Sequence, residues 1–235
     1  MNGYLRLASV VVLVATLGGT SYVLGQPIAS STFDTDDEGW MVVSDGDPPH
    51  YAPPHWSDVG GPSGGFIYDT DMDGGSWGFQ APQEFLGDVS AAYGHELTFD
   101  FFADKIGPEP EHQKVRVALS DPAGIGILVE VPSPLPAGQV AHREITLDDS
   151  EEWFTFDYFS GQVGPLATPA EIQAVLGNLG YLFLGAEMWD GYDQPEENPP
   201  VVGELVAYDN VILVPEPAGL SLLALGGLLV TRRRR

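Results

Sequence analysis

Short runs in which apolar and polar residues alternate recur along most of this chain, and they constrain its fold more than any other feature. Alternation with a period of two places one set of side chains on each face of a β-strand. Clusters of Gly, Pro and Asp separate the runs and indicate tight turns. The predicted strands cover residues 40–44, 65–69, 76–82, 96–104, 114–121, 125–131, 143–149, 153–159, 181–189 and 206–214. This pattern predicts an all-β chain folded as a jelly-roll β-sandwich.

One helix is predicted between the strands at 153–159 and 181–189. Thr168 is placed to cap its start, Pro169 suits the first helical position, and Glu171 completes a capping box. The apolar residues that then share one helix face are Ile172, Val175, Leu176 and Leu179. We expect this single short helix to close one end of the sandwich.

The charge balance and the absence of cysteine exclude several classes of function. The formal net charge is -25, and the only basic residues between positions 27 and 214 are Lys105, Lys114, Arg116 and Arg143. An acidic surface of this kind repels nucleic acid and anionic lipid, and it concentrates cations. Without cysteine, the chain has no disulfide, thiolate zinc site or thiol nucleophile. Because of the acidic charge, we predict that nucleic acid is not a partner.

The N-terminus has the pattern of a secretory signal peptide. Arg6 precedes an apolar run from Leu7 to Leu17, and small residues follow. The predicted signal covers residues 1–25, with cleavage after Gly25 or, as an alternative, near Ser30. An uncleaved membrane anchor is disfavoured, because a spanning helix needs roughly 20 apolar residues.

The C-terminus, residues 215–235, has three parts in a fixed order. The motif Pro215, Glu216 and Pro217 is followed by the apolar run 218–230 and then by Arg232, Arg233, Arg234 and Arg235. Arginines stay on the cytoplasmic side when such a tail inserts, which leaves the acidic body outside. This order resembles the PEP-CTERM sorting signal of Gram-negative bacteria. A plain C-terminal membrane helix is the alternative.

The PEP-CTERM resemblance implies a route and a location for the protein. It implies export, initial anchoring in the inner membrane by the C-terminal tail, and processing by an exosortase-type enzyme. It further implies display at the cell surface or in the extracellular matrix, with exopolysaccharide and biofilm material as the setting.

The central part of the chain resembles a second family. The segments that carry the resemblance are 33–40, 60–101, 168–187 and 208–213, among which "WGFQAPQEFLGDVSAAYGHELTFDF" is the most distinctive. They resemble the laminin IV type A domain, also called laminin B, so the predicted domain covers residues 31–214. The resemblance implies a jelly roll without catalytic residues, found in extracellular matrix proteins and in solitary secreted bacterial proteins. We therefore expect a structural or adhesive module and not an enzyme.

Clustered carboxylates predict structural calcium, which takes six to eight oxygen ligands. Jelly rolls that resemble carbohydrate-binding modules often hold calcium where the first and last strands lie side by side. In this chain that arrangement would gather Asp34, Asp36, Glu38 and Asp209. The alternative is that Asp209 caps a strand end and the other three face water.

A second, weaker calcium site is predicted at 69–75. Asp69, Asp71 and Asp73 precede Gly74 as they would in an EF-hand loop, but Gln80 stands where the bidentate glutamate belongs. The flanking strands predict a hairpin loop instead of a helix pair. A solvated acidic turn is the alternative.

Two segments rich in aromatic residues predict sugar binding as the alternative function. Tyr51 and Trp56 lie in the loop 50–56, which prolines stiffen, while Trp189 and Tyr192 lie in 188–193. Exposed rings on rigid loops suit recognition, here of exopolysaccharide. The competing interpretation is that these rings cover the edge of the sandwich.

A carbohydrate-active enzyme is the third reading of the sequence. Glycosidases need two carboxylates on the sugar-facing wall, but no spacing selects a pair from the 34 acids. The five histidines form no metal-binding motif, and no nucleophile-elbow motif occurs. The sequence therefore nominates no catalytic residue.

Overall fold

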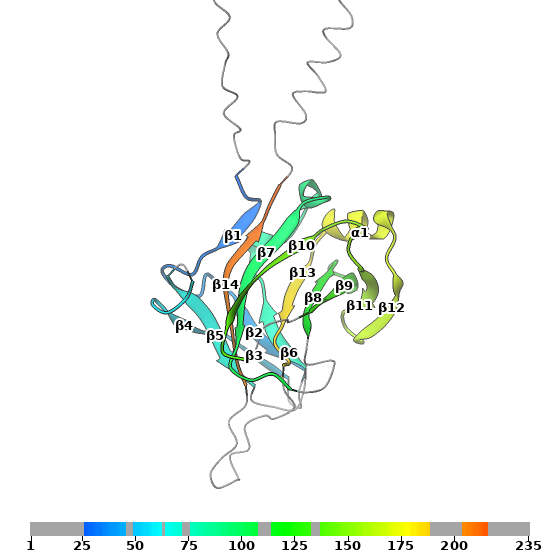
Figure 1. Ribbon diagram of the computed structural model, residues 1–235. Coiled ribbons are helices and arrows are strands. Elements are labelled where there is room, and N and C mark those ends of the chain that lie inside the picture. The colour runs from blue at the N-terminus through cyan, green and yellow to red at the C-terminus, as the bar shows by residue number, and fades with distance from the viewer. Residues whose placement is uncertain are drawn as a thin grey trace, which may run out of the picture. The chain divides into compact units, whose positions relative to one another are not determined.

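The structure is a computed structural model, and it describes residues 26–45, 49–62, 64–71, 76–107, 114–132, 137–188 and 204–215. These residues form two antiparallel β-sheets that pack as a sandwich (Figure 1). The prediction of an all-β sandwich with one short helix is confirmed.

The first sheet has six strands and contains both the first and the last strand of the described chain. Its order is β10 (Val140–Thr146), β7 (Glu96–Ala103), β14 (Leu205–Leu213), β5 (Phe66–Thr70) and β4 (His55–Ser57), with β1 (Ala29–Ser31) also paired to β14. Ser31 lies opposite Val211 in that last pair. The predicted neighbourhood of the first and last strands is therefore present. Because β1 begins at Ala29, the sandwich starts before the predicted boundary at residue 31.

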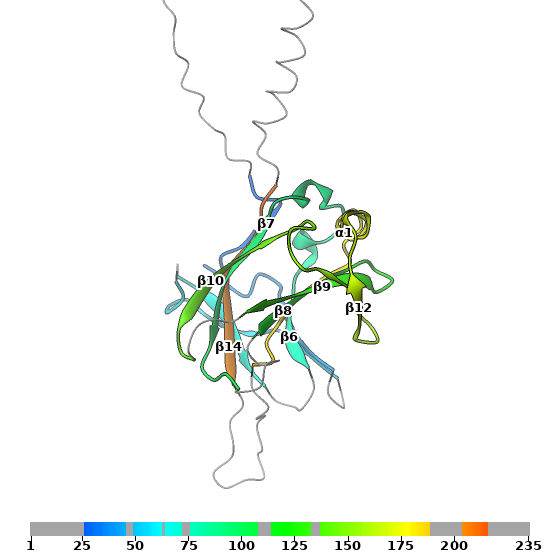
Figure 2. The same ribbon diagram turned by 45° about the vertical axis from the view of Figure 1, so that its right-hand side comes forward.

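The second sheet has eight strands. Its order is β12 (Gln162–Leu166), β11 (Phe154–Asp157), β9 (Ile125–Pro132), β8 (Lys114–Ser120), β13 (Tyr181–Gly185), β6 (Trp77–Gln80), β2 (Met41–Ser44) and β3 (His50–Ala52). Figure 2 shows β8, β9 and β12 of this sheet to the right of β10, β7 and β14, with β12 at the outer edge.

The core lies between the two sheets and is rich in aromatic side chains. The Tyr208 ring of β14 contacts Phe79 of the opposite sheet, with ring centroids 5.3 Å apart. The Tyr208 hydroxyl also donates a hydrogen bond of 2.6 Å to the Gly185 carbonyl at the end of β13. One buried side chain therefore joins the sheets through both its ring and its polar tip.

The helix α1 (Pro169–Leu176) begins where the sequence predicts. Thr168 and Glu171 form the capping box, and the helix packs on β8, β9 and the 3-10 turn η2 (Ser90–Ala92). Ile172, Val175 and Leu176 belong to the core, whereas Leu179 is buried beyond the helix end. A second 3-10 turn, η1, covers Gln83–Phe85.

The interpretation of 50–56 as a loop is wrong. His50–Ala52 is the edge strand of the eight-stranded sheet, and His55–Ser57 is an edge strand of the six-stranded sheet. Pro53 and Pro54, which lack the amide hydrogen that a central strand needs, carry the chain from one sheet to the other. The two strands are too short to produce a recognisable alternation.

The expected hairpin at 69–75 is also wrong. β5, before this segment, pairs with β14 and β4, whereas β6, after it, pairs with β13 and β2. The chain therefore passes from the six-stranded sheet to the eight-stranded sheet between β5 and β6. Among the described residues, no helix has the length and apolar character that a membrane span requires.

Candidate metal centre

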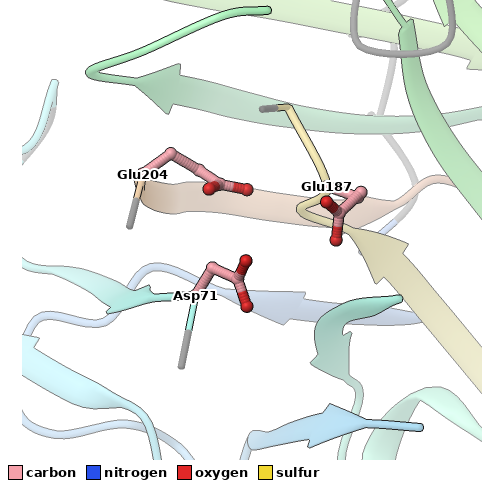
Figure 3. Close-up of side chains that lie close together, drawn as sticks. All are labelled: Asp71, Glu187 and Glu204. Atoms are coloured by element: carbon pink, nitrogen blue, oxygen red, sulfur yellow. The ribbon is translucent and has the colours of Figure 1, made fainter. Parts of the chain in front are cut away.

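Three carboxylates from distant parts of the sequence meet at one end of the sandwich. Asp71 follows β5, Glu187 follows β13, and Glu204 immediately precedes β14. One carboxylate oxygen of each residue lies within 4.8 Å of one from each of the others. Figure 3 shows the three side chains turned toward a common space. The site therefore draws ligands from both sheets.

Two of the three carboxylates are buried, and the third is partly buried. Glu204 is fully buried, Asp71 is 2% exposed, and Glu187 is partly buried. Carboxylates this close repel one another in a dry environment, so a bound cation, a basic neighbour or a proton must stabilise them. The arrangement is thus suited to a group that carries positive charge.

Hydrogen bonds fix the position of Glu204. Its Oε1 accepts hydrogen bonds from Trp77 Nε1 and from the Met188 amide, each 3.2 Å long. The Asp71 amide donates to the Glu204 carbonyl at 3.1 Å, which ties the end of β5 to the start of β14. Second partners of this kind orient a ligand before a metal binds.

The geometry matches the coordination chemistry of a hard divalent cation. Calcium binds oxygen at 2.3–2.6 Å, so two oxygens on one ion lie at most roughly 5 Å apart. The 4.8 Å limit that the three carboxylates satisfy lies within this span. Backbone carbonyls and water can complete a shell of six to eight oxygens.

The structure separates the residues of the weaker predicted calcium site. Asp71 enters the candidate metal centre, while Asp69 lies inside β5, where its Oδ1 accepts the Thr70 amide and its Oδ2 lies 3.4 Å from His55 Nδ1. Asp73 lies outside the described residues. The EF-hand interpretation therefore identified one residue of the present cluster.

The four carboxylates of the first predicted calcium site are held mainly by local bonds. The Glu38 amide donates to Asp36 Oδ1, and Glu38 Oε1 accepts the Phe33 amide. Asp34 and Asp209 both reach the loop 60–65, because a Cβ at Gly64 would stand 3.1 Å from Asp34 Oδ1 and one at Gly61 would stand 3.0 Å from Asp209 Oδ2.

Oxygen spacing distinguishes the candidate metal centre from the first predicted calcium site. Among the described residues, Asp71, Glu187 and Glu204 are the acids that lie as close together as one ion requires, and no three of the first four do so. Calcium binding by the first four stays a prediction.

The predicted sugar-binding aromatics do not form one platform. Tyr51 is 69% exposed on β3 of the eight-stranded sheet, whereas Trp56 is 36% exposed on β4 of the other sheet. Trp56 Nε1 also donates to the Phe33 carbonyl at 2.7 Å. Trp189 and Tyr192 lie outside the described residues, and so does the sorting signal after Pro215.

Sequence reasoning missed Glu187 and Glu204. Each is a single acid at the end of a predicted strand, at 181–189 and 206–214, and no spacing links the two. The available signal was weak. An acid next to the end of a buried strand is unusual, and it usually has a charged or hydrogen-bonding partner. Only the tertiary fold joins the two to Asp71.

The fold of this chain is similar to that of a laminin domain. In the solved structure of the L4b domain of human laminin alpha-2, 97% of that chain matches 80% of this one, with a TM-score of 0.53 and 16% identity. A structure of an exo-beta-agarase matches over 75% of this chain and 26% of its own, with a TM-score of 0.38 and 12% identity.

The sequence comparison covers the centre of the sandwich. The family Laminin B (Domain IV) matches residues 78–195, from β6 to beyond β13. This segment includes α1 and most of the eight-stranded sheet. With half of its length matched and the same fold as a laminin domain, the chain belongs to the Laminin B (Domain IV) family.

Proposed function

We propose that this protein is a non-catalytic structural or adhesive module of a bacterial extracellular matrix. Membership of the Laminin B family is the observation that carries this proposal. The acidic, cysteine-free body suits a protein that works outside the cell in the presence of divalent cations. Its partners would be exopolysaccharide or a matrix protein.

The proposal includes export and surface display. The predicted signal peptide leads to the outside, and the PEP-CTERM-like tail directs processing by an exosortase-type enzyme after transient anchoring in the inner membrane. Signal cleavage after Gly25 would leave β1 whole, whereas cleavage after Ser30 would remove Ala29 and Ser30, which are two of its three residues paired with β14. We therefore favour the earlier site.

The proposal also includes a structural calcium ion at Asp71, Glu187 and Glu204. The support is the burial of the cluster and the fit of its oxygen spacing to one ion. An ion there would hold the end of β5 and the start of β14 against the end of β13. It would act on stability and not on a reaction.

Thermal unfolding with and without calcium tests the site. An ion at roughly a hundred times its Kd, bound only to the folded state, adds about 2.7 kcal/mol, which raises the Tm by about 5–10 °C. We expect chelation to reverse this shift, and Asp71→Asn and Glu204→Gln to remove it. The calcium-dependent difference is compared within each variant, because either substitution also changes the starting Tm.

Two control variants distinguish loss of the metal centre from a general effect of charge and from binding at the first predicted site. Glu152→Gln removes the same charge from an exposed position and should keep the full shift. Asp34→Asn should also keep it, and a shift lost there instead would move the ion to the first predicted site. Equal melting curves in calcium and chelator would exclude a structural ion.

The enzyme reading is tested separately. We expect no release of reducing sugar from any polysaccharide that the protein binds. The spacing of the acids in the sequence identifies no catalytic pair, and the family implies no catalytic residue. Steady release that a variant of two acids abolishes would contradict the non-catalytic proposal.

A further inference from the structure

A groove crosses the outer face of the six-stranded sheet. Its volume is about 430 Å³, and residues of β5, β7 and β14 form its floor. Figure 1 shows these strands side by side, with β10 next to β7. One wall comes from the loop after β4, at Gly60, Gly61 and Pro62. None of the three metal-centre acids lines the groove.

An apolar row of side chains runs across the groove. Strand register places Tyr68 opposite Ala207, Ala207 opposite Phe102, and Phe102 opposite Val140. Adjacent strands lie about 4.8 Å apart, so Tyr68 and Phe102 stand roughly 10 Å from each other with the small Ala207 between them. Phe66 widens the aromatic wall, since its ring centroid lies 5.4 Å from that of Tyr68.

A polar row runs parallel to the apolar one. Asp209 lies opposite Asp100, and Asp100 lies opposite His142. Asp100 and Phe102 are two residues apart on one strand, so the rows lie roughly 7 Å apart on the same face. The groove therefore has one aromatic side and one side of hydrogen-bonding groups.

The polar row is held in place by the backbone. β14 has an irregular register between Asp209 and Ile212, and Asn210 there has a φ of 52°. This bulge lets Asn210 Nδ2 donate to Asp100 Oδ2 at 2.6 Å. Asp100 Oδ1 lies 2.8 Å from His142 Nδ1. Each of the two Asp100 carboxylate oxygens has more than one lone pair, so it can also accept a ligand hydroxyl.

We propose that this groove binds a pyranose unit of a neutral polysaccharide. A pyranose has an apolar face of C–H groups and a rim of hydroxyls, which matches one aromatic row beside one row of acceptors. Tyr68 and Phe102 would stack on the ring, while Asp100 accepts hydroxyl hydrogens. The proposal deepens the proposed adhesive function by naming its partner, and it does not depend on the metal centre.

Charge selects among polysaccharides. Asp100 and Asp209 are poorly exposed carboxylates inside the groove, and the whole chain has a formal net charge of -25. The two carboxylates and the net negative charge of the protein repel a sugar that carries a carboxylate or a sulfate. A neutral polysaccharide would instead donate hydrogen bonds from its hydroxyl groups to the carboxylate oxygens of the groove.

Affinity electrophoresis of the full chain in gels with hydroxyethyl cellulose, barley β-glucan or galactomannan tests this proposal. We expect retardation in at least one neutral polysaccharide and none in alginate. Tyr68→Ala, Phe102→Leu and Asp100→Asn should each weaken binding at least tenfold. Phe102→Leu keeps an apolar side chain without a stacking face, so a loss there separates ring stacking from mere filling of space.

Tyr51→Ala serves as the matched control, since it removes a more exposed ring from the other sheet. It should leave retardation unchanged, and so should a chelator at a temperature where the protein stays folded. The retardation experiment can therefore be interpreted even if the calcium proposal fails.

Three results would overturn the groove assignment. These are no retardation in any of the three neutral gels, equal retardation in alginate, and retardation that Tyr51→Ala abolishes while Phe102→Leu retains it. A dimer in solution that Phe102→Leu dissociates would instead identify a second copy of the chain as the occupant.

Discussion

The indole Nε1 of Trp77 donates a hydrogen bond of 3.2 Å to Glu204 Oε1 across 127 residues of sequence. Trp77 lies on β6 of one sheet and Glu204 at the start of β14 of the other. The bond therefore joins the two sheets and orients a carboxylate of the candidate metal centre. It connects stability of the sandwich with binding of a cation.

Replacing Trp77 with phenylalanine tests this connection. We expect the free energy of unfolding to fall by about 1.5–3 kcal/mol, the range for a hydrogen bond to a charged group. The calcium-dependent rise in Tm should also shrink, because Glu204 loses a partner that orients it. Urea denaturation and thermal melts measure the two effects.

Trp153→Phe is the matched comparison for that prediction. Trp153 is as buried as Trp77, but its Nε1 donates to the neutral Thr146 carbonyl at 3.0 Å. Its loss should cost about 1 kcal/mol and leave the calcium shift intact. Identical behaviour of the two variants would mean that Trp77 acts only as a core side chain.

The capping box of α1 predicts a second, local effect on stability. Thr168 Oγ1 accepts the Glu171 amide, and Glu171 Oε2 accepts the Thr168 amide at 2.7 Å. Thr168→Ala should lower the free energy of unfolding by about 1 kcal/mol, because a free amide at the helix start loses its acceptor. Gln173→Ala, exposed on the same helix, should change it by less than about 0.5 kcal/mol. Equal losses in urea would show that the cap does not contribute.

Tyrosine burial predicts a loss of stability at alkaline pH. Burial first, and then the neighbouring Tyr51 and Tyr181, raise the pKa of Tyr158 to about 12 from its ordinary value of 10. Burial also raises the pKa of Tyr208 well above its ordinary value. Well below pH 10 both phenols are protonated in the folded and unfolded states, so neither changes stability with pH there.

As the pH rises through 10, the unfolded chain releases these protons before the folded one, so stability falls as the pH rises toward 12. Urea melts between pH 9 and about 11 should show this fall. Tyr158→Phe should make it shallower, and Tyr208 accounts for part of what stays. An unchanged slope in Tyr158→Phe would assign the loss to other groups.

Periodicity determined the strands that are long and half buried. β7 and β8 were predicted nearly to the residue, because alternating core and surface positions produce the pattern that the sequence shows. The start of α1 was equally readable, since Thr168, Pro169 and Glu171 act within one turn. Strands of three residues, such as β1 and β4, have no period to read. β12 contains Gly164 and Pro165, and all its residues are exposed, so it has no alternation of buried and exposed positions.

The sequence by itself determined the class of fold and the acidic character, because these follow from local patterns and composition. The roles of the two termini stay predictions. Tertiary structure decided which acids meet and which rings share a face. Asp71 was recognisable as one of three aspartates, but its partners Glu187 and Glu204 are brought to it by the packing of two sheets. Likewise, Tyr68, Ala207 and Phe102 form a row only through strand register. A contact between strands far apart in the chain leaves no mark on the spacing of residues within either one.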